Sequence, residues 1–193
     1  DPAFGGDPAF DALVAELDSR GMYLVLDAVP NHVSSDSPYF DRFSRHAEVG
    51  ACENISSPYR DWFFFQDVPA GTGSCMRDDG TPLGANYTGW FGVETLPQIN
   101  TNHPDVLAYW FGTPGGSPDL PVSTATHWMD RGIDGWRVDV VPDVIGVNPT
   151  FFETWREVTK AAYPDSVSYS ETWSEGDVRD RILGDEFDTT MNY

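Results

Sequence analysis

Hydrophobic positions repeat with a helical period in some stretches of this chain and run almost unbroken in others. Residues 8–20 place apolar side chains three and four positions apart, and Gly21 follows them, which predicts a helix that ends there. Residues 22–29, MYLVLDAV, form a short and nearly continuous apolar run. Such a run is typical of a strand that is buried on both faces of a parallel sheet. The start of the chain therefore predicts a helix followed by a buried strand.

The same alternation returns in the second half of the chain. Helical spacing or composition predicts helices at residues 105–112, 121–131, 149–163 and 175–183. Apolar runs predict strands at residues 135–141, 166–173 and 187–193. Strands that alternate with helices form parallel sheets, so the pattern predicts the α/β fold class. Residues 31–104 lose this periodicity and are rich in Gly, Pro, Asn, Asp and aromatic residues. An irregular connection of this length is usually functional.

Polar residues follow each predicted strand directly. They occupy positions 27–32, 139–143 and 171–173. In parallel α/β folds, both barrels and open sheets, active sites lie at the carboxyl ends of the strands. These polar groups are therefore the first candidates for a functional site.

Arg137 and Asp139 are two residues apart in an apolar run, so both side chains point to the same face of a strand. A buried charge needs a partner, and a structural ion pair is one interpretation. The other interpretation is that Asp139 faces a pocket. An adjacent arginine favours an ionised carboxylate and lowers its pKa, which suits a nucleophile.

Glu171 lies at the end of the next predicted strand, between Tyr169 and Trp173. Poorly solvated aromatic surroundings raise the pKa of a carboxyl group, which suits a general acid. A single Glu at a strand end is more often an ordinary surface residue. Together with Asp139, however, it makes a pair of carboxylates in opposed environments, which is what cleavage of a glycosidic bond requires. Aromatic residues of the long connection offer flat surfaces for sugar rings, although core packing accounts for about half of them.

The chain carries 31 acidic and 11 basic residues, a net charge of −20. This field repels nucleic acids and anionic membranes but not a neutral substrate. It also favours a protein adapted to high salt, where screening removes the self-repulsion. Cys52 and Cys75 could be free thiols or one disulfide, and the Gly-, Pro- and Ser-rich surroundings slightly favour the disulfide. Localisation stays open between cytoplasmic and secreted, and the oligomeric state is unknown.

Several motifs resemble those of a known family. LDAVPNH, GWRVD and SETW look like the first three signature blocks of the α-amylase family, family 13 of the glycoside hydrolases. SPYRDWFFF, YTGWFGVETLPQIN and FDTTMNY are similar to its neopullulanase and amylopullulanase branch. The resemblance implies strands 3 to 6 of a (β/α)8 barrel, with barrel parts at residues 1–32 and 105–193. Residues 33–104 would form an irregular domain inserted after the third strand.

The resemblance also implies roles for individual residues. Asp139 would be the nucleophile, Glu171 the general acid/base, and Arg137 the partner that orients Asp139. His32 would contact the sugar at the cleavage point. The resemblance further implies that Asp27, a structural member of the first block, Tyr87 and Trp90 belong to the substrate-binding set, and that Asn31 helps to bind calcium. No organic cofactor is expected.

The leading hypothesis is a retaining glycoside hydrolase that cleaves starch, maltodextrin or pullulan by double displacement. A transglycosidase, in which a sugar hydroxyl replaces water, is one alternative. A non-catalytic carbohydrate-binding or transport-accessory protein is the other, because a fold alone does not define a function. The presence of both acids favours an enzyme. Asp143 leans toward neopullulanases, but Pro142 fits neither group, so the preference for α-1,4 or α-1,6 bonds stays open.

The family also requires a third acid, an Asp that follows a His in a later block. No His-Asp pair occurs in this sequence. The resemblance therefore implies an internal fragment with about half of a barrel, because a complete barrel typically needs about 250 residues. Half a barrel leaves sheet edges and core uncovered. We expect the 193-residue chain alone to be catalytically inactive and poorly stable.

Overall fold

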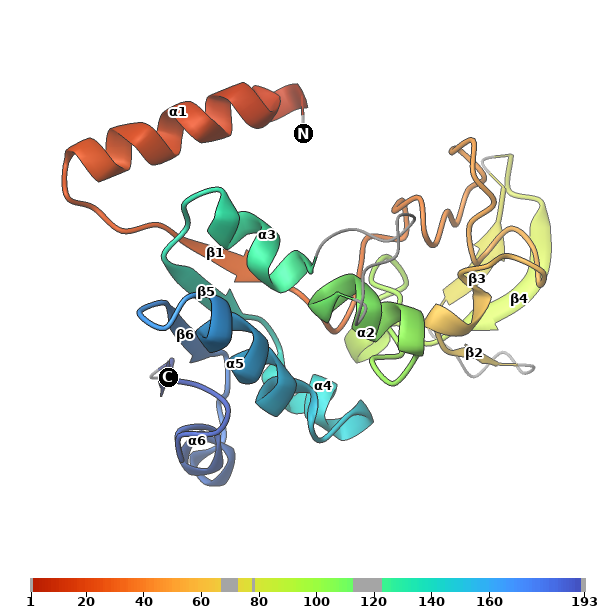
Figure 1. The fold of residues 1–193 in the computed structure, drawn as a ribbon. Helices are drawn as coiled ribbons and strands as arrows, with labels where there is room; N and C mark the ends of the chain where they lie inside the picture. Colours follow the sequence, from red (N-terminus) through yellow and green to blue (C-terminus); the bar gives the residue numbers. More distant parts are fainter. Residues whose placement is uncertain (1, 67–72, 78, 113–122, 192–193) are drawn as a thin grey trace. The chain divides into compact units, whose positions relative to one another are not determined.

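The computed structural model describes residues 2–66, 73–77, 79–112 and 123–191, and the chain forms two compact units (Figure 1). The parallel-sheet unit comprises residues 1–28, 107–145 and 149–193. The antiparallel-sheet unit comprises residues 29–106 and 146–148. Each unit is described by itself. The borders of the barrel parts and of the inserted domain stay a prediction.

The parallel-sheet unit contains a sheet with the strand order β1-β5-β6-β7, in which all neighbouring strands are parallel. The strands are β1 (Val25–Ala28), β5 (Gly135–Val138), β6 (Val167–Ser170) and β7 (Thr189–Thr190). Asp27 pairs with Arg137, which in turn pairs with Tyr169. The strands follow each other in chain order with helices between them. The predicted fold class, part of a (β/α)8 barrel, is therefore confirmed.

Helices occur close to the positions that the hydrophobic period predicts. They are α1 (Gly6–Ser19), α2 (Pro104–Phe111), α3 (Thr124–Asp130), α4 (Val141–Val147), α5 (Phe151–Ala162) and α6 (Glu175–Arg181). Residues 121–122 of one predicted helix lie outside the described residues. The sequence analysis missed α4, although Pro142 is tolerated in a first helical turn because its missing N–H would have no partner there. None of the helices described is both long and apolar enough to cross a bilayer.

A cluster of aromatic side chains lies in the core of the parallel-sheet unit. Trp155 is fully buried on α5 and lies 5.8 Å from Trp136 of β5, measured between ring centroids. The Trp136 indole N–H donates to the carbonyl of Ala125 at 3.0 Å. Gly135 begins β5 where a Cβ atom would meet the Val167 carbonyl oxygen at 2.1 Å. Only glycine allows β5 and β6 to approach this closely at that position.

The antiparallel-sheet unit contains strands β2 (Phe65–Gln66), β3 (Gly73–Met76) and β4 (Pro82–Tyr87) in the order β2-β4-β3. The inserted region, predicted to be irregular, thus contains a small antiparallel sheet among its loops. Cys52 and Cys75 form a disulfide that ties a loop to β3, which is the alternative that the composition favoured. Phe40 is fully buried in this unit, with its ring centroid 4.6 Å from that of Tyr87. Pairing, packing and the disulfide together hold a segment that has little periodicity of its own.

Candidate active site

The two predicted catalytic acids follow neighbouring strands of the parallel sheet. Asp139 comes directly after β5, and its N–H donates to the Ala28 carbonyl at 2.8 Å. Glu171 comes directly after β6, and its N–H donates to the Val138 carbonyl at 2.8 Å. The backbone ladder therefore continues as far as both acids. It fixes their Cα positions at the carboxyl end of the sheet, where barrel enzymes carry their chemistry.

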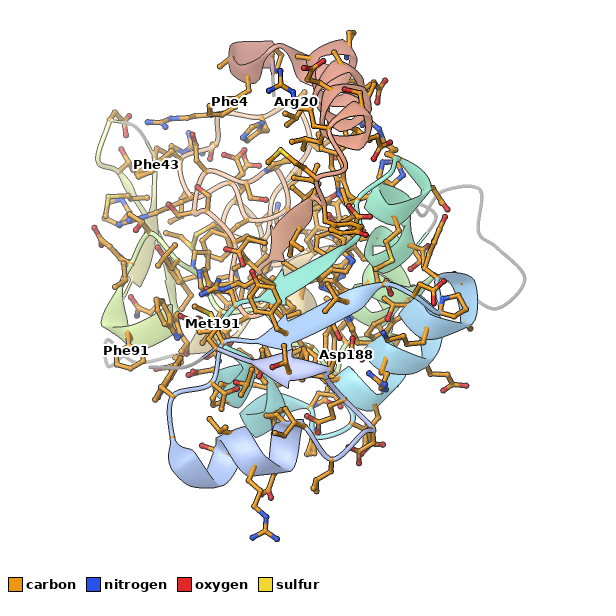
Figure 2. All side chains as sticks on the ribbon, turned by 90° about the vertical axis from the view of Figure 1, so that its left-hand side faces the viewer. Phe4, Arg20, Phe43, Phe91, Asp188 and Met191 are labelled. Atoms are coloured by element: carbon orange, nitrogen blue, oxygen red, sulfur yellow. A yellow bond between two sulfur atoms is a disulfide. The ribbon has the colours of Figure 1, made fainter. Side chains whose placement is uncertain are left out.

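Arg137 of β5 joins both acids through one guanidinium. Its Nη1 lies 2.5 Å from Asp139 Oδ1, and its Nη2 lies 2.8 Å from Glu171 Oε1. Nη1 also lies 2.7 Å from Asp27 Oδ1. The guanidinium additionally donates through Nε to the Met191 sulfur at 3.4 Å; Met191 is labelled in Figure 2. The structure thus brings Asp27, Arg137, Asp139 and Glu171 together, and their roles in catalysis and substrate binding stay a prediction.

The side chains of this cluster are withdrawn from solvent to different degrees. The Asp139 and Glu171 side chains are 18% and 17% exposed, whereas that of Asp27 is 54% exposed. Bonds from Asp27 and Asp139 outweigh the opposing effect of burial and raise the pKa of Arg137, so this residue stays charged. Asp27 therefore acts as an outer partner of Arg137, while Asp139 and Glu171 form the inner pair.

Arg137 acts to lower the pKa of Asp139, as expected, but the net shift of this pKa is upward. Burial raises the pKa of the Asp139 carboxyl, and the nearby Glu171 raises it further, which together outweigh the lowering effect of Arg137. The spacing within one strand indicated the effect of Arg137 on this pKa, but not the effect of Glu171, which comes from the next strand. The cluster therefore holds more negative than positive charge. Surplus negative charge in a desolvated site stabilises a cationic species such as an oxocarbenium-like transition state.

Val140 is a further residue of this site that the sequence analysis missed. It has φ = 51°, the left-handed region that β-branched residues very rarely adopt. Its N–H donates to Glu171 Oε2 at 2.9 Å, and the Val141 N–H donates to the Glu171 carbonyl at 3.3 Å. Such a conformation costs about 1 to 3 kcal/mol and persists where the surroundings enforce it. The signal available in the sequence was Pro142, because a helix that begins so soon after β5 leaves Val140 to make the turn.

His32 and Trp90 lie together in the antiparallel-sheet unit. Their rings stack with centroids 4.9 Å apart and an interplanar angle of 13°. Burial lowers the pKa of His32, so its neutral form is favoured. Phe91, labelled in Figure 2, makes an edge contact with Trp90 at 5.1 Å and is 76% exposed. This pair provides a flat, mostly neutral surface, and its predicted contact with sugar stays a prediction.

The prediction that Tyr87 faces the substrate is wrong. Tyr87 is 0% exposed and packs within the core of the antiparallel-sheet unit. Its hydroxyl donates to the Glu94 carbonyl at 2.6 Å, and burial raises its pKa to about 12. The side chain therefore has no free surface to offer a sugar. The pairing of β4 with its neighbours, which the sequence did not show, turns this residue inward.

Asn31, the predicted calcium ligand, is buried in a network of amide hydrogen bonds. Its Oδ1 accepts from Gln98 Nε2 at 3.3 Å, and its Nδ2 donates to His32 Nδ1 at 3.3 Å. Within the part of the chain that the structure describes, no three His, Cys, Asp or Glu side chains gather as a metal-binding group. Calcium prefers six to eight oxygen ligands, usually with carboxylates among them. Asn31 therefore bonds to Gln98 and His32, and its binding of calcium stays a prediction.

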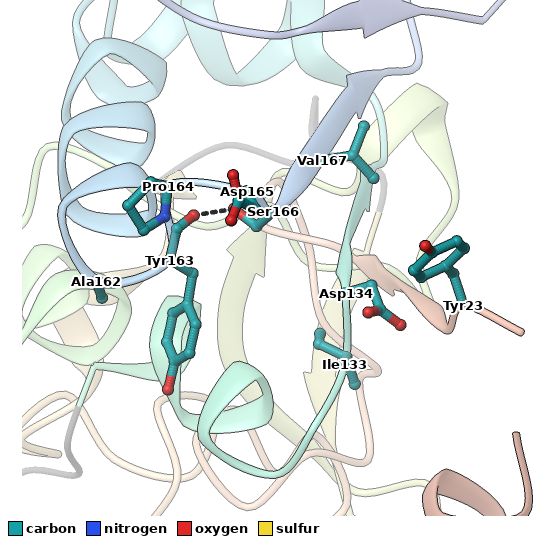
Figure 3. A pocket seen from close by; sticks show the side chains of 9 residues that line it. All are labelled: Tyr23, Ile133, Asp134, Ala162, Tyr163, Pro164, Asp165, Ser166 and Val167. Atoms are coloured by element: carbon teal, nitrogen blue, oxygen red, sulfur yellow. Dashed lines mark hydrogen bonds between the residues drawn. The ribbon is translucent and has the colours of Figure 1, made fainter. Parts of the chain in front are cut away.

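A cavity of about 590 Å³ lies elsewhere in the parallel-sheet unit (Figure 3). Its lining includes Tyr23, Asp134 and Val167, which lie at or before the first residues of β1, β5 and β6. The cavity therefore lies at the amino end of the sheet, opposite Asp139 and Glu171. One of its carboxylates is already engaged, since Asp134 Oδ2 accepts from the Leu24 N–H at 2.7 Å. This end of a barrel supports stability and does not carry the chemistry.

The parallel sheet with helices between its strands, and with paired acids at its carboxyl end, places the chain in the class of (β/α)8-barrel proteins. The chain belongs to the α-amylase family, because residues 1–193 match the family described as alpha amylase, catalytic domain.

Individual relatives agree with this assignment. The chain is 34% identical over 194 residues to neopullulanase 2 of Thermoactinomyces vulgaris, covering all of this chain and 28% of that protein. The acarbose-soaked debranching enzyme from Nostoc punctiforme has a TM-score of 0.76 at 31% identity, over 100% of this chain and 35% of that chain. The cyclic α-maltosyl-(1→6)-maltose hydrolase from Arthrobacter globiformis, in complex with maltose, has a TM-score of 0.71 at 30% identity, over 96% and 35%. The chain thus spans about a third or less of the length of these relatives.

Proposed function

We propose that the intact natural protein carrying this chain hydrolyses α-linked glucans such as starch, maltodextrin or pullulan, with retention of configuration at the anomeric carbon. Asp139 attacks that carbon while Glu171 protonates the glycosidic oxygen. Glu171 then removes a proton from water, which hydrolyses the glycosyl–enzyme. Each step follows the double-displacement scheme of retaining glycosidases.

The observation that carries this proposal is the bridge that Arg137 forms between Asp139 Oδ1 and Glu171 Oε1. A hydrogen bond between the Asp139 and Glu171 side chains, which also contributes to the raised pKa of Asp139, brings the two carboxyl groups close together. Retaining enzymes need their carboxyl groups about 5 to 5.5 Å apart, closer than inverting enzymes, which must admit a water molecule between the general base and the sugar. Arg137 also holds the nucleophile in place, because its fork can bond two carboxylates at once.

The proposed substrate class rests on charge and on the relatives. A net charge of −20 disfavours anionic substrates and leaves neutral glucans unaffected. One related structure was soaked with acarbose and another is a complex with maltose. The stacked His32 and Trp90 rings supply a flat apolar surface of the kind on which sugar rings pack.

The test is hydrolysis of maltotetraose and pullulan by the intact natural protein, followed by proton NMR of the first product. We expect the α-anomer first, because two inversions restore the starting configuration. Glu171→Gln should lower kcat/KM for maltotetraose on the order of 10² to 10⁴-fold, the usual contribution of a general acid.

Glu157→Gln is the matched control for this substitution. Glu157 lies exposed on α5, so the same chemical change there should leave the rate within about twofold, as expected for a surface substitution. A β-anomer as first product would exclude the retaining mechanism. Full activity of the Glu171→Gln protein would exclude the assigned acid.

A further inference from the structure

Val140 connects the strand that ends at the nucleophile with the helix that follows. Its carbonyl accepts from the Asp143 N–H at 3.2 Å and from the Val144 N–H at 3.5 Å, so this carbonyl starts α4. Its N–H donates in the other direction, to Glu171 Oε2 at 2.9 Å. The side chain is 1% exposed. The carbonyl of Val140 thus bonds to α4, while its N–H bonds to Glu171, which follows β6.

We propose that the backbone amide of Val140 is a positioning group that holds the Glu171 carboxylate in the orientation needed for proton transfer. This inference rests on the proposed function, because it assumes that Glu171 is the general acid/base. It adds a residue that acts through Glu171 and does not touch the substrate.

The order of the strands and the left-handed turn at Val140 together place two backbone amides on the side of Glu171. In an extended strand, successive N–H groups alternate in direction, and the Asp139 N–H already pairs with Ala28 of the neighbouring strand. The Val140 N–H therefore points to the opposite side, toward β6, and donates to the Glu171 carboxylate, while the turn at φ = 51° keeps the next amide, that of Val141, on the same side. A valine in this conformation is an outlier that the surrounding packing has to enforce.

The amide and Arg137 contact different oxygens of the same carboxylate. Arg137 Nη2 lies 2.8 Å from Oε1, and the Val140 N–H donates to Oε2. Two contacts at two oxygens fix both the position and the plane of the carboxylate. General acid catalysis depends on this geometry, because the acid must lie within hydrogen-bond reach of the leaving oxygen.

The test replaces the Val140 amide by an ester in the intact natural protein, using α-hydroxyisovaleric acid introduced by nonsense suppression. This change removes one N–H and keeps the side chain. The matched control is the same replacement at Val141, whose N–H donates to the Glu171 backbone carbonyl and not to the carboxylate. Both proteins are assayed on maltotetraose and on 2,4-dinitrophenyl α-maltoside, whose leaving group departs without a proton.

We expect the Val140 ester to lower kcat/KM for maltotetraose at least tenfold and to leave kcat/KM for the dinitrophenyl substrate within twofold. The Val141 ester should change the two substrates by equal factors. Equal loss on both substrates at Val140 would show a merely structural role and overturn the proposal. An unchanged rate on maltotetraose would also overturn it.

A measurement without substrate separates this inference from the proposed function. If the intact protein cleaves neither substrate, the proposed function fails, and hydrogen exchange of the Val140 amide decides the hydrogen bond alone. Slow exchange that becomes at least tenfold faster in Glu171→Ala, with Val144 exchange unchanged, supports the positioning contact. Fast exchange of the Val140 amide in the native protein overturns it.

Discussion

The two ends of the parallel sheet hold charged clusters of opposite composition. At the carboxyl end, Arg137 is shared by Asp139, Glu171 and the more exposed Asp27. At the amino end, the acid is in the minority. Asp188, labelled in Figure 2, lies just before β7 and accepts hydrogen bonds or ion pairs from Arg156, Lys160 and the Ser168 N–H, each at 2.9 Å.

The pKa shifts of the two aspartates show what this difference means. Burial and Glu171 raise the pKa of Asp139, so the fold opposes its charge. Burial also acts to raise the pKa of Asp188, but the bonds from Lys160, Arg156 and Ser168 outweigh it and lower that pKa. A satisfied ion cluster contributes to stability, whereas a cluster with surplus charge is strained and available for chemistry. Charge balance therefore separates the structural end of the sheet from the proposed reactive end.

The largest expected effect comes from replacing the central arginine at each end by lysine. A lysine ammonium keeps the charge but cannot bond two carboxylates with the geometry of a guanidinium fork. Arg137→Lys should lower kcat on the order of 10² to 10³-fold, the cost of losing a preorganised donor in an active site. Arg156→Lys, where Lys160 remains beside Asp188, should leave kcat within about twofold, as a change remote from the chemistry.

Steady-state kinetics of both lysine variants in the intact protein provide the measurement. Circular dichroism of each variant serves as the control for folding. Equal losses of kcat at the two positions would remove the distinction between the reactive and the structural end.

A smaller effect, on folding stability instead of on kcat, is expected when Asp188 loses its charge. Asp188→Asn should lower the free energy of unfolding at pH 7 by about 1.5 to 3 kcal/mol, the usual value of hydrogen bonds to a charged group. Because the folded pKa is lowered, this stabilisation is present above the ordinary value of 3.8 and is lost as pH falls through the folded value.

Urea unfolding of the native protein and of Asp188→Asn, at pH 7 and at pH 3, measures this difference. The gap between the two proteins should narrow at the lower pH. A gap that stays constant with pH would mean that the lost stability is steric in origin and not electrostatic.

The smallest expected effect is a gain in stability at the carboxyl end of the sheet, opposite in sign to the loss expected at Asp188. Asp139→Asn should raise the free energy of unfolding at pH 7 by about 0.5 to 2 kcal/mol, as is common when a strained functional group is removed. The folded pKa of Asp139 is raised, so the native protein is favoured by protonation. The stabilisation of the folded state by the protonated Asp139 is therefore fully present below the ordinary pKa of 3.8. It is lost as the pH rises through the folded pKa.

The same urea titration measures the Asp139→Asn protein, with Asp188→Asn as its matched control. The advantage of Asp139→Asn should vanish below pH 4, where the native carboxyl is already protonated. Destabilisation at pH 7 would show that the ion pair with Arg137 outweighs burial and the repulsion from Glu171.

The parallel sheet could be predicted because each strand carries its own signal. Strands β1 and β5 are short apolar runs with helical periods before or after them. β5 is mostly buried, whereas β1, expected to be buried on both faces, is partly exposed. The antiparallel strands carry no such mark. GSCM of β3 and PLGANY of β4 are poor in β-branched residues and include glycine or proline. They form because pairing and the Cys52–Cys75 disulfide hold them, and neither effect is local.

In the candidate site, too, the features with a local sequence signal could be predicted, and those that depend on neighbouring strands could not. Arg137 and Asp139 could be paired from their spacing in one strand, and Glu171 from its place after the next strand. The direction in which the Asp139 pKa shifts could not be predicted, since it depends on the burial of this residue and on its distance from Glu171. Tyr87 was misassigned because the face of a strand that is buried depends on its partners. The role of Val140 rests on one backbone angle, which its side chain would normally disfavour.

The Cys52–Cys75 bond has a consequence for how this molecule would respond to a protease. Any single cut between residues 52 and 75 leaves the two pieces covalently joined, because the sulfur bridge spans the break. Such a nicked chain would migrate at its full mass on a gel run without reductant and separate into two bands once a thiol is added. A protein that looks intact under the first condition can therefore already be cleaved, and only the reduced lane would reveal it.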